Sequence, residues 1–417
     1  MKINKIKIIA FFSVIILSVP WLLNSYPKSA YYIDTAFNYL DSNFAALFLR
    51  DSITIAQLQN KYKTIGNGQP KIRVLVMPGH EPNYGGAEYG SLKERDMTVD
   101  LAKYLQGFLE SDKHYEVIVP RDKNEWNPIF KKYFEEQWDN ILLFLSENKN
   151  EMIRLVNNGV VSKTFDGIVH NTVPKNVAVR LYGINKWVND NDIDIAVHIH
   201  FNDYPRKNNY LPGKYSGFAI YIPERQYSNS TTTKAIADLV FKRLAKYNAI
   251  SNLPKEMSGI IEEQELIAIG SHNTLDAPSM LIEYGYIYEP QFTEPSLRDE
   301  ILRDMAFQTY LGIQDFFGDN SLSLKYDTQI LPYIWKNNID QEKFSKVDVF
   351  ALQTALSMEG LYPGIGKNKN DCPRSGIFGP CTSEALSKLQ KMYNIINENN
   401  SVGPLTKSVL NSRYSSR

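Results

Sequence analysis

The 417-residue sequence has no excess charge of either sign and almost no cysteine. Lys+Arg and Asp+Glu each number 46, so no strong electrostatic field favours nucleic acid or an acidic partner. Its apolar share of 43% and its 26 Tyr are typical of a folded globular protein and exclude a disordered chain. The length leaves room for two or three domains.

Long hydrophobic runs are scarce, and the clearest one stands at the start of the chain, at residues 8–23. Three lysines precede it, and no acidic residue occurs before Asp34. This pattern predicts that residues 1–30 are a signal peptide or a membrane anchor, and that the rest of the chain is exported to the periplasm or cell envelope. The run is shorter than the roughly 20 residues of a comfortable spanning helix, which favours a signal peptide. The absence of a small-residue cleavage site favours an uncleaved anchor, so both alternatives stay open.

Three stretches have the pattern of strands that end in a side chain suited to metal or proton chemistry. VLVMPGH ends in His80, DIAVHIH in His200 and SMLIE in Glu283. Apolar runs without alternation predict strands that are covered on both faces of a sheet. In open α/β sheets the working groups lie just beyond the carboxyl ends of such strands.

From Lys71 onward, strand-like and helix-like segments alternate, which predicts an α/β domain over residues 70–318. Residues 31–69 form a partly helical stem, and residues 124–172 form an aromatic-rich insertion with two expected helices. Further strands are expected at 115–122, 218–223 and 266–269. One helix is expected to begin near Ser91 and another near Asn176. The remaining expected helices are 127–147 and 149–157, both in the insertion, 231–247 and 297–317.

Two of the candidate site residues have ordinary structural alternatives. Ser91 and Glu94 fit a capping box at a helix start, in which the carboxylate only satisfies a backbone N–H. Glu283 could be a surface glutamate at a turn, although a carboxylate after Met-Leu-Ile is costly unless it is paired or binds a metal. His198 and His200 share one strand face, so one of them need not be a ligand.

Two imidazoles and one carboxylate suit Zn²⁺, and three protein ligands leave a fourth position for water. His80, Glu94 and His200 supply this set, and Glu283 is the free carboxylate that takes a proton from that water. The spacing is only moderately specific, because the ligands come from separate elements and no compact HExxH-type motif fixes them.

The motifs VLVMPGH, the Gly-rich loop, LKERD, HIHFN and MLIEYGYI resemble those of the zinc-dependent N-acetylmuramoyl-L-alanine amidases of the amidase_3 type, over roughly Lys71 to Phe317. Arg180 and Asn185 ahead of HIHFN are part of the resemblance. It implies a mixed sheet flanked by helices on both faces. It also implies His80, Glu94 and His200 as zinc ligands, Glu283 as the catalytic carboxylate, and cleavage of the amide between N-acetylmuramic acid and L-alanine.

The sequence departs from this family's pattern at three places. His198 stands where the family usually has Ser, Phe201 where it has Ala, and Tyr286 where it has Phe. None of these changes removes an implied ligand.

Residues 319–343 are expected to be a linker to a small all-α unit at 344–414. Its helical spacing and the stretch from Gly376 to Thr382 resemble the three-helix peptidoglycan-binding domain. Of the only two cysteines, Cys372 lies four residues before this stretch and Cys381 lies within it. Outside the cytoplasm an even, local pair predicts a disulfide.

Together these features predict a cell-wall hydrolase that acts on peptidoglycan, with a membrane contact if the N-terminal segment is uncleaved. One rival is a zinc peptidase that cuts stem peptides. Another is a catalytically silent wall-binding protein, which the intact set of four site residues disfavours.

Overall fold

The computed structural model describes residues 52–66, 70–163, 173–270, 273–319, 324–339, 344–399 and 401–415. The expected N-terminal signal or anchor lies outside these residues. Among the residues that are described, none of the helices combines the length and apolar character needed to cross a bilayer.

A six-stranded mixed sheet forms the centre of the molecule. In spatial order its strands are β4 (Tyr115–Ile118), β1 (Ile72–Pro78), β5 (Ile195–Asn202), β8 (Ser279–Tyr286), β6 (Ala219–Pro223) and β7 (Ile260–Glu263). The first four run parallel to one another, β6 is antiparallel to β8, and β7 is parallel to β6. The predicted fold class is therefore confirmed.

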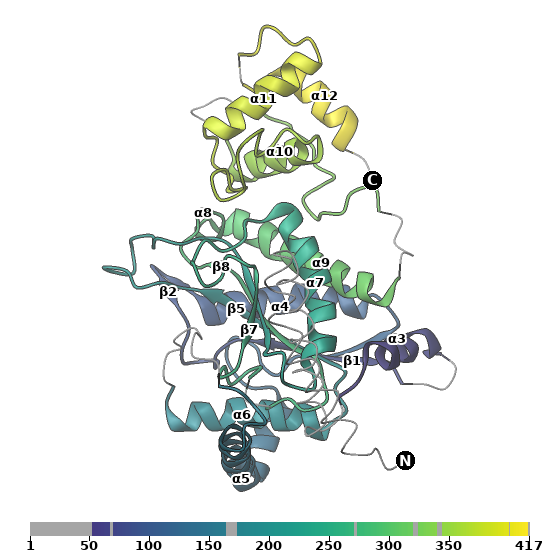
Figure 1. The fold of residues 1–417 in the computed structure, drawn as a ribbon. Coiled ribbons are helices and arrows are strands. Elements are labelled where there is room, and N and C mark those ends of the chain that lie inside the picture. The colour runs from purple at the N-terminus through teal and green to yellow at the C-terminus, as the bar shows by residue number, and fades with distance from the viewer. Residues whose placement is uncertain are drawn as a thin grey trace, which may run out of the picture.

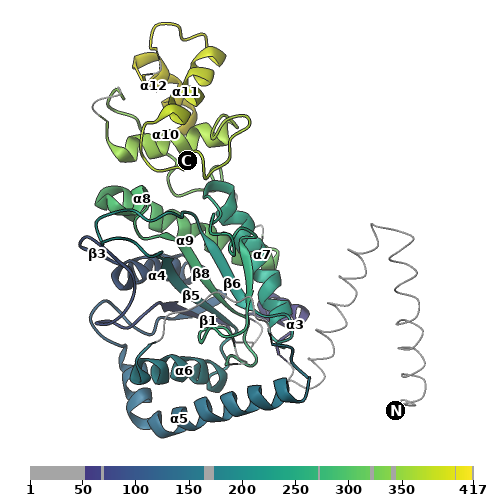
Figure 2. The ribbon, with the colours of Figure 1, turned by 60° about the vertical axis from the view of Figure 1, so that its left-hand side comes forward.

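Helices cover both faces of this sheet (Figures 1 and 2). One face packs against α4 (Glu94–Glu110), α7 (Ser230–Tyr247) and α9 (Pro295–Phe317). The other face packs against α5 (Pro128–Asn157) and α6 (Lys175–Asp190). Apolar strand residues alternate between these two cores, which explains why β1 and β5 are apolar almost throughout. Two short helices are α3 (Ile55–Thr64), in the expected stem, and α8 (Pro290–Thr293).

The three strands expected to carry the site are neighbours in the sheet. The register aligns Met77 of β1 with His198 of β5, and His200 of β5 with Glu283 of β8. Because the three strands are parallel, their carboxyl ends meet at one edge of the sheet.

Three expected elements differ in the structure. The helix expected from Ser91 begins at Glu94, because Ser91 turns between the short antiparallel strands β2 (Glu88–Tyr89) and β3 (Leu92–Lys93). The two helices expected in the insertion are one continuous helix, α5, since no Pro or Gly interrupts it after Pro128. Residues 266–269 form a turn, and the strand β7 pairs earlier, at Ile260–Glu263.

The C-terminal unit consists of α10 (Lys346–Met358), α11 (Pro380–Met392) and α12 (Pro404–Tyr414). Cys372 and Cys381 form a disulfide within it, as predicted. Within the expected linker, the described residues 324–339 are packed rather than loose: Trp335 is 1% exposed, and Ile339 is fully buried.

A buried arginine joins the C-terminal unit to the sheet domain. The Arg374 guanidinium lies 3.2 Å from Asp304 on α9, donates to the carbonyl of Tyr247 on α7, and donates to Thr354 on α10. The side chain of Arg374 is 3% exposed and that of Asp304 is fully buried. The two units therefore share a desolvated ion pair, and Figure 1 shows α10 above α9.

Arg374→Ala should destabilise the protein by roughly 3 kcal/mol, because it leaves the buried Asp304 carboxylate without its charge partner. Lys388→Ala is a matched control, because its ion pair with Glu384 is on the surface and water screens such a pair, so that its loss should change the stability far less. Urea unfolding measures both changes. Equal, small losses would contradict a structural role for the Arg374 pair.

Candidate active site

Strand geometry brings the two histidines to one edge of the sheet. β1 ends at Pro78, and Gly79 and His80 turn away from it, with the His80 backbone at φ 67°. The Gly79 N–H still donates to the carbonyl of Ile199 on β5. This bond holds the turn that carries His80 beside His200.

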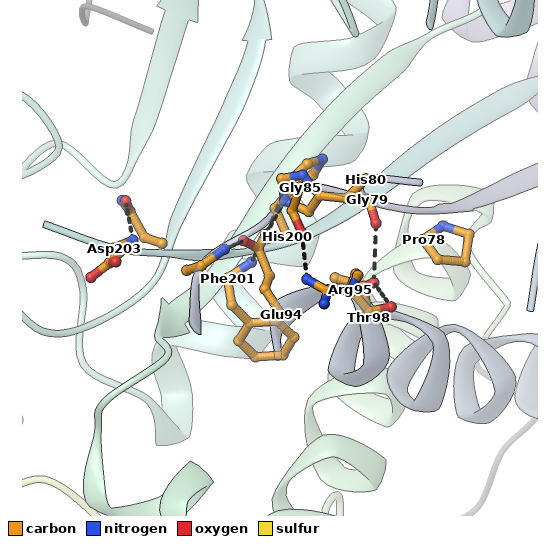
Figure 3. A network of polar contacts seen from close by, with 12 residues as sticks. Pro78, Gly79, His80, Gly85, Glu94, Arg95, Thr98, His200, Phe201 and Asp203 are labelled. Carbon is orange, nitrogen blue, oxygen red and sulfur yellow. Dashed lines mark hydrogen bonds and ion pairs between the residues drawn. The ribbon is translucent and has the colours of Figure 1, made fainter. Parts of the chain in front are cut away.

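Glu94, the first residue of α4, joins the two imidazoles. Its Oε1 lies 2.8 Å from His80 Nε2 and 3.2 Å from His200 Nδ1. The two rings lie edge to face, with centroids 4.8 Å apart. Figure 3 shows these three side chains converging between the sheet edge and the start of α4.

This set fits a divalent cation. One donor atom from each of His80, Glu94 and His200 lies within 4.8 Å of the other two. His80 Nε2 is sealed from solvent but makes no hydrogen bond, despite its closeness to Glu94. A buried nitrogen without a hydrogen-bond partner is expected where a lone pair faces a metal position.

The electrostatics favour an ionised Glu94 and a neutral His200. Burial alone raises the pKa of Glu94, but the charge of His80 and the hydrogen bond from His200 outweigh it, so the pKa lies below its usual value. Burial lowers the pKa of His200. An ionised carboxylate and a neutral imidazole are the forms that bind metal.

The Glu94 carboxylate makes no capping box. Its Oε2 accepts from the Ala87 N–H at 2.7 Å, and its Oε1 accepts from the Phe201 N–H at 3.0 Å. The N-cap residue, Lys93, makes no side-chain capping bond. Glu94 is thus turned into the site, where two backbone donors fix its orientation.

Glycines make room for this cluster. A Cβ atom on Gly79 would lie 2.5 Å from His200 Cε1, and one on Gly86 would lie 3.0 Å from His80 Cδ2. Gly86 also has φ 86°, a conformation that side chains rarely adopt. The Gly-rich loop therefore packs its backbone directly onto the proposed ligands.

Glu283 lies next to His200 across the β5–β8 pair, on the same face of the sheet. Its Oε2 is buried and makes no hydrogen bond. Burial, then the charges of Glu94 and Glu256, raise the pKa of Glu283 well above its usual value. Such a carboxyl group is a stronger base than an exposed one.

His198 lies one layer deeper on the same strand face as His200. It is buried, its Nε2 makes no hydrogen bond, and it does not belong to the cluster of three donor atoms. Burial, then the charge of His200, lowers the pKa of His198 to about 3. The geometry therefore places His200, and not His198, in the cluster of possible metal ligands.

Three supporting groups were not found from the sequence. Arg121 is 2% exposed and donates to the carbonyls of Pro78 and Gly79, which braces the turn before His80. Glu81 pairs with both ends of the Arg180 guanidinium at 2.5 and 2.8 Å. Glu256 is buried near Glu283 and accepts from four groups: Asn202, Tyr221, Ser251 and Tyr286. Arg121, Glu81 and Glu256 lie in loops, where the sequence has no helical or strand periodicity. Their spacing therefore does not predict that they are buried beside the site.

An α/β sheet with two imidazoles at its strand ends and a carboxylate at the start of a neighbouring helix is typical of the class of metal-dependent hydrolases. The model of one family, the N-acetylmuramoyl-L-alanine amidases (Amidase_3), matches residues 74–315. The match covers more than half of the chain and all four proposed site residues. The chain therefore belongs to this amidase family, whose members are metal-dependent and act on peptidoglycan.

Solved structures with similar folds include the CwlD amidase from Clostridioides difficile in complex with the GerS lipoprotein. It is 15% identical, has a TM-score of 0.39, and the alignment covers 60% of this chain and 99% of that one. The amidase Ami1 from Mycobacterium smegmatis is 14% identical, with a TM-score of 0.38 and coverages of 60% and 100%. AmiC2 of Nostoc punctiforme is 16% identical, with a TM-score of 0.36 and coverages of 60% and 99%. None of the curated proteins compared with the chain matches it.

Gly79→Ala should weaken metal binding roughly 10–100-fold, the usual effect of disturbing the groups that orient a ligand, because the new methyl group displaces the His200 ring. Gly107→Ala is the matched control: it lies within α4 and nothing lies within 4 Å of the added Cβ. It should leave the affinity unchanged and stabilise the helix by up to about 1 kcal/mol. Chelator competition measures the affinity, and a Gly79→Ala variant with wild-type affinity would contradict the place given to His200.

Proposed function

We propose that His80, Glu94 and His200 hold a zinc ion and that Glu283 transfers protons during amide cleavage. The observation that carries this proposal is the shared position of Glu94 Oε1, within 3.2 Å of both imidazoles. Two nitrogens and one oxygen are a donor set that zinc prefers. When bound at such a site, zinc lowers the pKa of water and polarises a carbonyl oxygen.

The protein's own residues supply orientation and proton transfer. Backbone donors at Ala87 and Phe201 hold Glu94, and the Gly-rich loop limits the space around His80. Glu283 lies outside the donor set but next to His200 in the register, so the Oε2 of the ionised side chain can take a proton from the attacking water. The same oxygen then gives that proton to the leaving amine of L-alanine.

The remaining segments suggest where the enzyme works. We propose that the N-terminal residues 1–30 export or anchor the chain at the cell envelope, and that the unit at 344–414 binds peptidoglycan. The three helices and the disulfide beside the Gly376–Thr382 stretch support this role. The buried Arg374 pair would keep this wall-binding unit at a fixed place above α9.

Glu283→Gln should keep zinc and lose about 10²–10⁴-fold in turnover, because the amide keeps the shape of the side chain but cannot accept a proton. Glu94→Gln is the companion variant, and it should weaken zinc binding itself. Zinc content and the release of new L-alanine amino groups from peptidoglycan are measured on both proteins.

Either of two results would overturn these roles. A Glu283→Gln enzyme with wild-type turnover would remove Glu283 from the reaction. A Glu283→Gln protein without zinc would make Glu283 a ligand.

A further inference from the structure

Two segments that project beside the site are joined into one structure. The β2–β3 hairpin leads directly into Glu94, and the loop at residues 203–216 follows β5 directly after His200, Phe201 and Asn202. The Gly90 N–H donates to the Asn209 carbonyl at 2.8 Å, and the Tyr89 hydroxyl donates to the Tyr210 carbonyl at 3.2 Å. The backbone of both proposed ligand-bearing segments thus continues into this projection.

A buried arginine makes the loop rigid. The Arg206 side chain is 4% exposed and pairs with both carboxylate oxygens of Asp203 at 2.8 and 2.9 Å. It also donates to the Glu88 carbonyl of the hairpin and lies over the rings of Tyr89 and Tyr288. Arg206 therefore ties the loop to the hairpin through a covered side chain that is paired with the partly exposed Asp203.

The loop presents an uncovered aromatic ring. Tyr210 is 76% exposed, which makes it one of the most exposed large apolar side chains in the part of the chain that the structure describes, and the neighbouring Leu211 is 47% exposed. The backbone of Tyr210 is fixed at both its N–H, by Asn208, and its carbonyl, by Tyr89. A rigid Tyr gives a large contact surface at a low entropic cost of binding.

The Tyr210 ring lies within reach of the proposed catalytic centre. It lies beside Gly90, where an added Cβ would be 3.9 Å from Tyr210 Cδ1. Gly90 is four residues from Glu94, so at most about 14 Å of extended chain separates them. A polymeric substrate that is cleaved at the centre can extend over the ring.

We propose that Tyr210 and Leu211 form a subsite for the glycan strand of peptidoglycan, with the Tyr210 ring stacked on the face of an N-acetylhexosamine ring. This inference rests on the proposed function and names the part of the substrate, further along the glycan strand from the cleaved bond, that the loop holds. The C–H face of a pyranose ring matches an exposed aromatic face, and the nearby Asn208 and Asn209 suit uncharged hydroxyl and acetamido groups. Asp203 and Arg206, the two opposite charges of this loop that pair, neutralise each other.

A fluorescent variant tests this subsite without any turnover. Tyr210→Trp keeps an aromatic face, and the full chain is studied without metal, so that cleavage plays no part. Glycan chains stripped of their stem peptides are added to the variant and to the wild-type protein. The Trp emission of the wild type is then subtracted from that of the variant at each glycan concentration. Ile153→Trp on α5, which is also exposed, is the matched control.

We expect saturable emission changes with stripped glycan for Tyr210→Trp and none for Ile153→Trp. No response, or a response to free stem peptide alone, would overturn the subsite. In the metal-loaded enzyme, Tyr210→Ala should lose about tenfold in kcat/KM on glycan-linked substrate, which corresponds to about 1.4 kcal/mol. It should act normally on a single muropeptide.

An equal effect of Tyr210→Ala on both substrates would also overturn the subsite. Failure of the wild-type enzyme to cleave either substrate would instead overturn the proposed function. The emission experiment needs no turnover, so it tests the subsite whether or not the wild-type enzyme cleaves these substrates.

Discussion

The buried carboxylate of Glu94 is the constraint on which the site depends. A charge at this depth is costly unless donors or cations surround it. Here two imidazoles, two backbone N–H groups and the N-terminus of α4 surround it. These partners come from the turn after β1, from the Gly-rich loop, from β5 and from α4 itself, so the sheet edge, the loop and the helix start must all be in place together.

The sequence predicted the parts of this arrangement that follow from periodicity and strand ends. β1, β5 and β8 were expected as apolar strands that deliver His80, His200 and Glu283, and the structure makes them neighbours. The place of Glu94 depended on the family resemblance, because its spacing equally fitted a capping box with Ser91. The assignments of all four residues as ligands and base stay predictions.

What the sequence missed depends on contacts between distant segments. The buried pairs of Arg121 with the carbonyls of the 78–79 turn, and of Arg374 with Asp304, join residues far apart in the chain. The rigid loop around Arg206 has the same origin. Such charges resemble ordinary surface residues until the fold buries them, and together they connect the catalytic centre, its rim and the C-terminal unit into one body.

Metal analysis of two histidine variants tests the central claim most directly, because His198 and His200 share a strand face but only His200 contacts Glu94. The account predicts about one Zn²⁺ per chain in the wild-type protein and in His198→Ala, and loss of the metal in His200→Ala. Retention of zinc by His200→Ala, together with its loss from His198→Ala, would contradict the account.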